Sequence, residues 1–275
     1  MSKNQDTNVY MREPIKYCKD IPVFSESDDY LRNYEAVAAD HLQALAKDGV
    51  NPWIVENDWV ELEESTASLI RKYRQPGDKI LDVGIGLGRL TARFPELDRY
   101  GMDISLSYLE KAAEKGIKVC YAKVEDMPYT HNFFDVVVCT DVLEHVLDLN
   151  LAIRQMLIVL KPGGYLIVRV PYREKLAHYL DKSYPYKYSH LRFFDEYSLA
   201  LLFTKVFNCT VMESSYVLYM PLDYKLKYQF PVYRVNKIYM QLTYLVKHLN
   251  KRLHSYLMRK SFDSVCINFV VKKTE

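Results

Sequence analysis

The chain has 275 residues, of which 49% are hydrophobic and 26% are charged, and its formal net charge is +2. This composition is that of a globular protein with a sizeable core, and the small net charge gives no overall attraction to nucleic acid. The polar N-terminus has no apolar signal region and no run of 18 apolar residues occurs, so we expect a cytoplasmic protein without a membrane-spanning helix.

The five cysteines, Cys18, Cys120, Cys139, Cys209 and Cys266, are odd in number and widely spaced. None belongs to a Cys-x-x-Cys pair, and four lie in apolar runs. This pattern indicates buried thiols in a reducing compartment and disfavours a disulfide framework or a zinc site.

The first 75 residues are expected to form a leader and lid helices. Residues 1 to about 25 have no regular pattern and look like a loose leader. Apolar residues then recur at helical spacing over 28–47 and again over 58–73. The first helix should end at Gly49, and the second before Pro76.

Strands and helices alternate through residues 76–219, and a last strand follows at 263–273. The other strands are predicted at 79–84, 99–105, 117–124, 134–141, 164–171 and 209–219, and the helices at 88–94, 106–116, 142–160 and 195–206. This alternation indicates an α/β, doubly wound, mostly parallel sheet of seven strands with helices on both faces. Ligands of such sheets bind at the carboxyl ends of the strands.

A glycine-rich turn, "ILDVGIGLGRL", follows the first of these strands at 80–90. A dinucleotide-binding loop has the pattern Gly-x-Gly-x-x-Gly, which would place its third glycine at position 89. That position is Arg89, and the glycines instead stand at Gly84, Gly86 and Gly88. The fit to a dinucleotide is therefore poor.

Four further motifs occur at the strand ends, in the order "GMDIS", "EDMPY", "FDVVVCTDVLEHV" and "LKPGGYLIV". Together with "LDVGIGLGRL" they make residues 76–215 resemble the class I S-adenosylmethionine-dependent methyltransferases. Within that class the chain looks most like the small-molecule group that includes ubiquinone-biosynthesis O-methyltransferases and many antibiotic- and sugar-modifying enzymes. The resemblance implies a Rossmann-like methyltransferase fold, with residues 76–219 and 263–275 as its core.

The resemblance also implies S-adenosylmethionine as the cofactor. Asp103 would accept the ribose hydroxyls, although it could instead cap the following helix. Glu125 and Asp126 would lie at the adenine edge, with a solvated acidic loop as the alternative, because Lys123 stands where related sequences often have an acid. The residues expected around the cofactor are Asp82, Gly84, Gly86, Gly88, Asp103, Ile104, Glu125, Asp126, Met127, Thr140 and Asp141.

Methyl transfer from a sulfonium needs a positioned nucleophile and, for a hydroxyl, a base. His145 and His190 are the candidate bases, and either could instead only brace its loop. A metal site made by Asp141, Glu144 and His145 is a further option, but adjacent helical side chains diverge, and no metal is expected.

Tyrosines crowd the segment after the fifth strand of the methyltransferase core, and the expected acceptor site contains Tyr34, Tyr172, Tyr186 and Tyr188. Such side chains favour an amphipathic acceptor. We therefore expect methylation of a hydroxyl, or less readily an amine, on a small or lipid-linked metabolite. The rival functions are a protein- or RNA-directed methyltransferase and a non-catalytic S-adenosylmethionine-binding protein.

Residues 220–262 read as a basic helical insertion, with nine Lys or Arg residues and one acid, Asp223. Leucines and other apolar residues recur at helical spacing along 235–257. The helix could pack on its own domain, form a homodimer, or contact anionic lipid through 232–260 as a peripheral helix at the inner membrane face. No nucleic-acid partner is expected.

Overall fold

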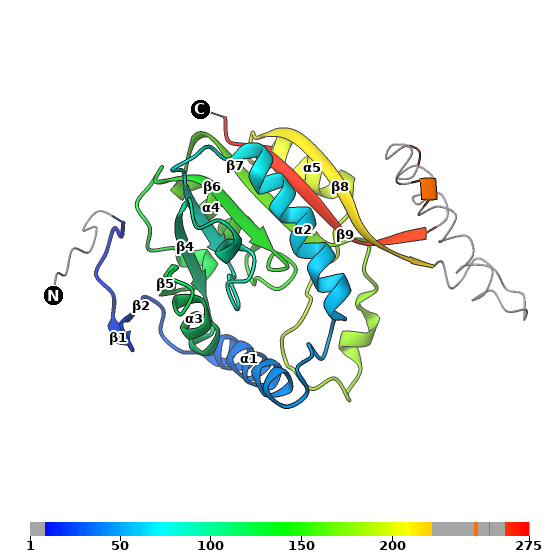
Figure 1. Cartoon of the computed structure of the whole chain (residues 1–275), viewed down its shortest axis with the longest axis horizontal. Coiled ribbons are helices and arrows are strands. Elements are labelled where there is room, and N and C mark those ends of the chain that lie inside the picture. Colours follow the sequence, from blue (N-terminus) through cyan, green and yellow to red (C-terminus); the bar gives the residue numbers. More distant parts are fainter. Residues whose placement is uncertain (1–8, 222–244, 247–252, 254–261, 275) are drawn as a thin grey trace, which may run out of the picture.

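The computed structural model describes residues 9–221, 245–246, 253 and 262–274. A single twisted sheet runs through the described part of the chain (Figure 1). Its nine strands lie in the order β1-β2-β5-β4-β3-β6-β7-β9-β8. Their bounds are β1 Lys16–Cys18, β2 Ile21–Val23, β3 Lys79–Val83, β4 Asp98–Asp103, β5 Lys118–Tyr121, β6 Phe134–Thr140, β7 Leu160–Pro171, β8 Thr210–Pro221 and β9 Phe262–Lys272.

Helices cover both faces of the sheet and fill its connections (Figure 1). The α-helices are α1 Asp29–Asp48, α2 Glu56–Tyr73, α3 Leu106–Ala113, α4 Leu149–Val159 and α5 Glu196–Leu201. Short 3-10 turns occur at Thr91–Arg93, Val124–Asp126 and Leu176–Leu180, and a π-helical turn at Leu202–Val206 continues α5. Among the described residues, no helix has the length and apolarity that crossing a bilayer requires.

The predicted α/β sheet is confirmed. Strands β3 to β7 pair in parallel, in the order β5-β4-β3-β6-β7. β9 then pairs antiparallel with both β7 and β8. Apolar side chains bury both faces of the central strands, and Ile80, Leu81, Val136 and Val137 have no exposed surface. The carboxyl ends of β3, β4 and β6 therefore meet at one edge.

The prediction of a loose leader is wrong for those of its residues that the structure describes. Residues 16–23 form the β1–β2 hairpin, and Val23 pairs in parallel with Tyr121 of β5, so the sheet has nine strands instead of seven. Ile21 and Val23 are buried on the core, with relative exposures of 4% and 3%. A strand of three residues is too short to show a period in the sequence.

Two predicted helices are shorter than expected. The helix after the glycine loop is only the 3-10 turn Thr91–Arg93. The helix predicted from residue 142 begins at Leu149, because Asp148 is its N-cap and accepts a hydrogen bond from the amide of Leu151. Residues 141–148 are consequently a turn at the end of β6, which leaves their side chains free to converge.

The two N-terminal helices have different positions. α1 contacts α3 and lies along the edge where the strands β3 and β4 end, whereas α2 packs against β7 and β8 (Figure 1). α1 therefore covers that edge, and α2 reaches it through Trp59, Leu62 and Glu63. The basic insertion expected at 220–262 falls almost wholly outside the described residues, and its role stays a prediction.

Candidate active site

A cavity of about 610 Å³ opens at the carboxyl ends of β3, β4 and β6, under α1 and the segment that follows β7. Its volume is in the range of small-molecule sites. The residues expected at a site that line this cavity are Asp82, Gly84, Gly86, Asp103, Ile104, Glu125, Thr140, Asp141, His145, His190, Tyr34, Tyr186 and Tyr188. Most of the site residues predicted from the sequence therefore lie around this one cavity.

Two expected cofactor residues have other roles. Asp126 lies outside the cavity lining and forms a bidentate ion pair with Arg12, with 2.6 Å between Oδ2 and the guanidinium. Met127 is buried in the core at 3% exposure. In the 3-10 turn at Val124–Asp126, only the first two residues face the cavity.

Gly88 and Tyr172 also lie outside the lining. Gly88 packs against α3, where a Cβ atom would lie 3.0 Å from the Cβ of Ala112, so this glycine permits close packing and not ligand contact. The Tyr172 hydroxyl donates to Glu196 at 2.7 Å, and its ring packs on Tyr216. Tyr172 therefore points away from the acceptor region.

The glycine loop forms the floor of the cavity. Gly84 has φ +70°, and a Cβ atom there would lie 2.2 Å from Cγ2 of Val142. Gly86 has φ +52° with open space beside it. Both backbones are in the left-handed region that favours glycine. The backbone of Gly86 is therefore exposed to whatever occupies the cavity.

Asp103 ends β4 and joins this loop. Its Oδ2 accepts the amide of Gly86 at 2.8 Å, and its Oδ1 accepts the amides of Ile104 at 2.8 Å and Ser105 at 3.0 Å. Burial raises the pKa of Asp103 to about 6. The N-cap of α3 is Ser105, which accepts from the amide of Tyr108. Ser105 therefore caps α3, and the carboxylate of Asp103 remains at the cavity wall.

Asp82 lies beneath the loop at 2% exposure. The hydroxyl of Thr91 donates to its Oδ2 at 2.5 Å, which ties the two sides of the glycine loop together. Burial raises the pKa of Asp82 to about 7. Beyond Asp103, Glu125 accepts the amides of Leu147 and Asp148 through Oε1, at 3.0 Å and 3.4 Å.

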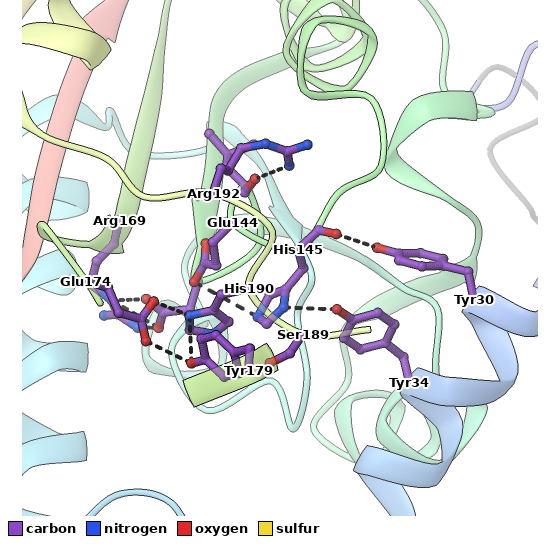
Figure 2. Close-up of polar contacts among 12 residues, drawn as sticks. Tyr30, Tyr34, Glu144, His145, Arg169, Glu174, Tyr179, Ser189, His190 and Arg192 are labelled. Atoms are coloured by element: carbon purple, nitrogen blue, oxygen red, sulfur yellow. Dashed lines mark hydrogen bonds and ion pairs between the residues drawn. The ribbon is translucent and has the colours of Figure 1, made fainter. Parts of the chain in front are cut away.

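The opposite end of the cavity holds two histidines (Figure 2). His145 comes from the turn after β6 and His190 from the segment after β7, and their ring centres are 4.5 Å apart. Tyr34 of α1 shares a hydrogen bond of 2.9 Å with Nδ1 of His145. Burial and the neighbouring His190 lower the pKa of His145 to about 4, against the opposing effect of a hydrogen bond to the Ser189 backbone. His145 is therefore neutral at pH 7.

His190 is paired with a carboxylate that the sequence reasoning missed. Nδ1 of His190 makes a hydrogen bond with Glu174, and the hydroxyl of Tyr179 lies 3.1 Å from the same nitrogen. Burial acts to raise the pKa of Glu174, but the hydrogen bonds from His190 and Tyr179 outweigh it and hold the pKa below its ordinary value. Glu174 is thus ionised at neutral pH. Its 16-residue separation from His190 gives no sequence signal.

Glu144 lies between the two histidines and the sheet. Its side chain is 1% exposed, and neither carboxylate oxygen has a hydrogen-bond partner within the described residues. Burial, followed by the charge of Asp141, raises its pKa well above the ordinary value. The sequence places Glu144 next to His145, but it does not show that the carboxylate is buried.

Asp141 is engaged elsewhere. The guanidinium of Arg169 donates to it at 2.6 Å and also donates to the Leu62 carbonyl at 2.8 Å. Asp141 has φ +56°, which turns the chain sharply after β6. A metal set made of Asp141, Glu144 and His145 is consequently not what the structure brings together.

The outer wall of the cavity is aromatic, and part of it was missed. The His41 ring of α1 lies tilted against Trp53 and Trp59, with centroids 5.1 Å and 5.7 Å apart, and the Arg89 guanidinium lies 3.7 Å from the Trp59 ring. The lining also contains Tyr30, Tyr108, Tyr179 and Tyr184. The two tryptophans are only six residues apart, and the fold brings both of them against His41 of α1.

Residues 81–168 match the family described as "Methyltransferase domain". The ubiquinone/menaquinone biosynthesis C-methyltransferase of Shewanella sediminis is 42% identical over 107 residues, which are 34% of this chain and 43% of that protein. The chain thus spans less than half the length of this curated relative.

Two solved structures share the fold. One is a putative methyltransferase in complex with the Haloferax volcanii Trm112 methyltransferase activator, with a TM-score of 0.60, 16% identity, and coverage of 90% of this chain and 98% of that one. The other is magnesium protoporphyrin IX methyltransferase of Synechocystis PCC 6803 with bound SAH, with a TM-score of 0.56, 12% identity, and coverage of 88% and 97%. The core of the chain is thus similar to methyltransferases in sequence over residues 81–168 and shares their fold.

Proposed function

We propose that the chain transfers the methyl group of S-adenosylmethionine to a small-molecule acceptor. The observation that carries this proposal is one cavity with Asp103 and the glycine loop at one end and a histidine pair at the other. The end with Asp103 can accept hydrogen bonds from the ribose hydroxyls of the cofactor. The end with the histidines can take a proton from the methyl acceptor. The cofactor and acceptor would then meet between them.

The charges that line the cavity support a sulfonium cofactor over a dinucleotide. The acidic residues in the lining are Asp82, Asp103, Glu125, Asp141, Glu144 and Glu63. The lining arginines, Arg89 and Arg169, are paired with Glu56 and Asp141. Carboxylates attract the ammonium and sulfonium groups of S-adenosylmethionine and repel a pyrophosphate. In this pose Asp103 holds the ribose, while Ile104 and Glu125 lie toward the adenine.

The base in this proposal is His190. Its pairing with Glu174 would stabilise the imidazolium that forms when His190 takes a proton from the acceptor. His145 is a weaker base because its pKa lies at about 4, so it would position the acceptor together with Tyr34. The acceptor oxygen or carbon then attacks the methyl carbon, the C–S bond breaks, and S-adenosylhomocysteine leaves.

The acceptor atom has two candidates. The aromatic wall favours an amphipathic molecule with a hydroxyl, which His190 could deprotonate for O-methylation. The Shewanella relative is named a C-methyltransferase, which favours attack by a ring carbon. Deprotonation of a phenol activates both its oxygen and its ring carbons, so one base serves either outcome.

Two experiments test this function. Calorimetry should show S-adenosylmethionine binding at about −8 kcal/mol, equivalent to a micromolar Kd. Tighter binding of NAD would refute the proposal. A cell extract incubated with the protein and carbon-13 methyl-labelled S-adenosylmethionine should contain a labelled product, and the chemical shift of its methyl carbon distinguishes an O-methyl from a C-methyl group.

The basic segment supports a further proposal from its sequence alone. If residues 232–260 rest on anionic lipid at the inner membrane face, binding to anionic vesicles should fall steeply with salt, because each basic residue contributes about 1 kcal/mol that salt screens. Equal co-sedimentation with anionic and neutral vesicles would leave the packed or homodimeric helix. A lipid-linked acceptor fits the first outcome.

A further inference from the structure

Glu144 is buried without a hydrogen-bond partner in the part of the chain that the structure describes. A buried carboxylate normally accepts several hydrogen bonds, because an unpaired one loses the stabilisation of water without replacement. Both oxygens of Glu144 lack a hydrogen bond within the described residues. Among the described residues, the nearest basic group is Nε2 of His145, 4.0 Å from Oε1.

A third side chain completes a cluster around this carboxylate. Glu144, His145 and His190 each offer one potential ligand atom, and these atoms lie within 4.8 Å of one another. Figure 2 shows the three side chains converging from the turn after β6 and the segment after β7. All three residues line the cavity.

We propose that Glu144, His145 and His190 bind a divalent transition-metal ion at the acceptor end of the cavity. Two imidazoles and one carboxylate are a donor set that zinc accepts at catalytic sites, where the fourth position stays open. Magnesium and calcium prefer oxygen ligands alone, so the two nitrogens select against them. The ion would give the buried carboxylate its missing partner.

The outer contacts of the histidines suit this role. Histidines that bind metals usually use their other ring nitrogen for a hydrogen bond that fixes the ring. Nδ1 of His190 is held by Glu174, and Nδ1 of His145 lies 2.9 Å from the Tyr34 hydroxyl. Nδ1 of each ring is thus engaged, and Nε2 of His145 lies 4.0 Å from Oε1 of Glu144.

The backbone holds the two segments together before any ligand binds. The amide of Leu191 donates to the carbonyl of Glu144 at 2.8 Å. The guanidinium of Arg192 donates to the carbonyls of Leu143, at 3.1 Å, and Val146. Ligand atoms around a tetrahedral zinc ion lie about 3.3 Å apart. Side-chain rotations that shorten the present separations by up to about 1.5 Å would complete the site.

The open coordination position gives the ion a role in catalysis. This role rests on the proposed methyl transfer. An acceptor hydroxyl bound there would lose its proton more readily, because the ion stabilises the alkoxide or phenoxide. A nitrogen that binds the ion does not accept a proton, so in the metal-bound form the proton passes to water. The oxygen then forms its bond to the methyl carbon as the C–S bond breaks.

The test uses the full chain, freed of metal by a chelator and titrated with Co²⁺, whose visible absorption reports nitrogen and oxygen ligands. We expect one ion to bind at this site and Zn²⁺ to displace it. Glu144→Gln and His190→Asn should each weaken binding at least about 100-fold, since each removes a ligand. His131→Asn, at an exposed position, is the matched control and should bind normally.

A further variant tests the site without removing a ligand, in case the ligand variants fail to fold. Glu174→Gln keeps all three ligands and should weaken Co²⁺ binding by about 10–100-fold through the orientation of His190. Co²⁺ binding that is unchanged in Glu144→Gln and His190→Asn would overturn the metal site. Binding of S-adenosylmethionine without metal binding would overturn the site and leave the proposed function. Metal binding at the cluster without binding of S-adenosylmethionine would support the metal site and overturn the proposed function.

Discussion

The carboxylate of Asp103 accepts a hydrogen bond from the amide of Gly86, with 2.8 Å between Oδ2 and N. This contact links the end of β4 to the turn after β3. The shape of the glycine loop and the proposed ribose site therefore depend on the same side chain. Any change at Asp103 should affect both.

Asp103→Ala should weaken S-adenosylmethionine binding by about 1.5–3 kcal/mol, the strength of hydrogen bonds to a charged group. Calorimetry measures this directly. Asp126→Asn is the matched control, because Asp126 pairs with Arg12 outside the cavity lining, and its affinity should stay within about twofold of the parent value. Equal losses in both variants would contradict the assignment of the ribose to Asp103.

Cofactor affinity should depend on pH. Burial raises the pKa of Asp103 from 3.8 to about 6, so in the cofactor-free chain this carboxyl becomes protonated as the pH falls through 6. Ribose hydroxyls donate to the ionised form, and binding should therefore be about tenfold weaker near pH 5 than near pH 7.

The stability of the cofactor-free chain should change in the opposite sense. Because the folded-state pKa of Asp103 exceeds its unfolded value of 3.8, its contribution to the free energy of unfolding falls as the pH rises from 3.8 through about 6. Asp103→Asn removes this titration. A variant that keeps the full pH dependence of cofactor binding would assign it to Asp82, whose pKa is about 7.

Gly84→Ala should lower the free energy of unfolding by about 2–5 kcal/mol, which combines left-handed backbone strain with a clash against Val142. Gly49→Ala is the control, since Gly49 has φ +67° but nothing within 4 Å of an added Cβ atom. Strain alone should cost about 1–2 kcal/mol there. Urea denaturation that gives equal losses would show that the contact with Val142 relaxes without cost.

Arg169→Met should lower the free energy of unfolding by about 2–4 kcal/mol. This side chain is 5% exposed, and its removal leaves Asp141 without its guanidinium partner and takes one of several donors from the Leu62 carbonyl. Arg12→Met breaks an exposed pair with Asp126 and should cost at most about 1 kcal/mol. Comparable losses in the two variants would indicate that water replaces Arg169.

The sheet and the cofactor end of the site could be predicted because their signals are local. Apolar runs bounded by turns indicate buried strands, and left-handed backbone at Gly84 and Gly86 requires glycine whatever lies nearby. The strand assignment placed Asp103 near the end of β4, where ligands of parallel sheets bind, and its expected contact with a ribose came from the family resemblance.

The acceptor end was decided by tertiary structure. His145 and His190 were visible as residues, but the hydrogen bond between Glu174 and His190 and the burial of Glu144 come from segments that meet only in the folded chain. A side chain's charge state and partners depend on what surrounds it in space, and sequence spacing carries no information about neighbours supplied by distant loops.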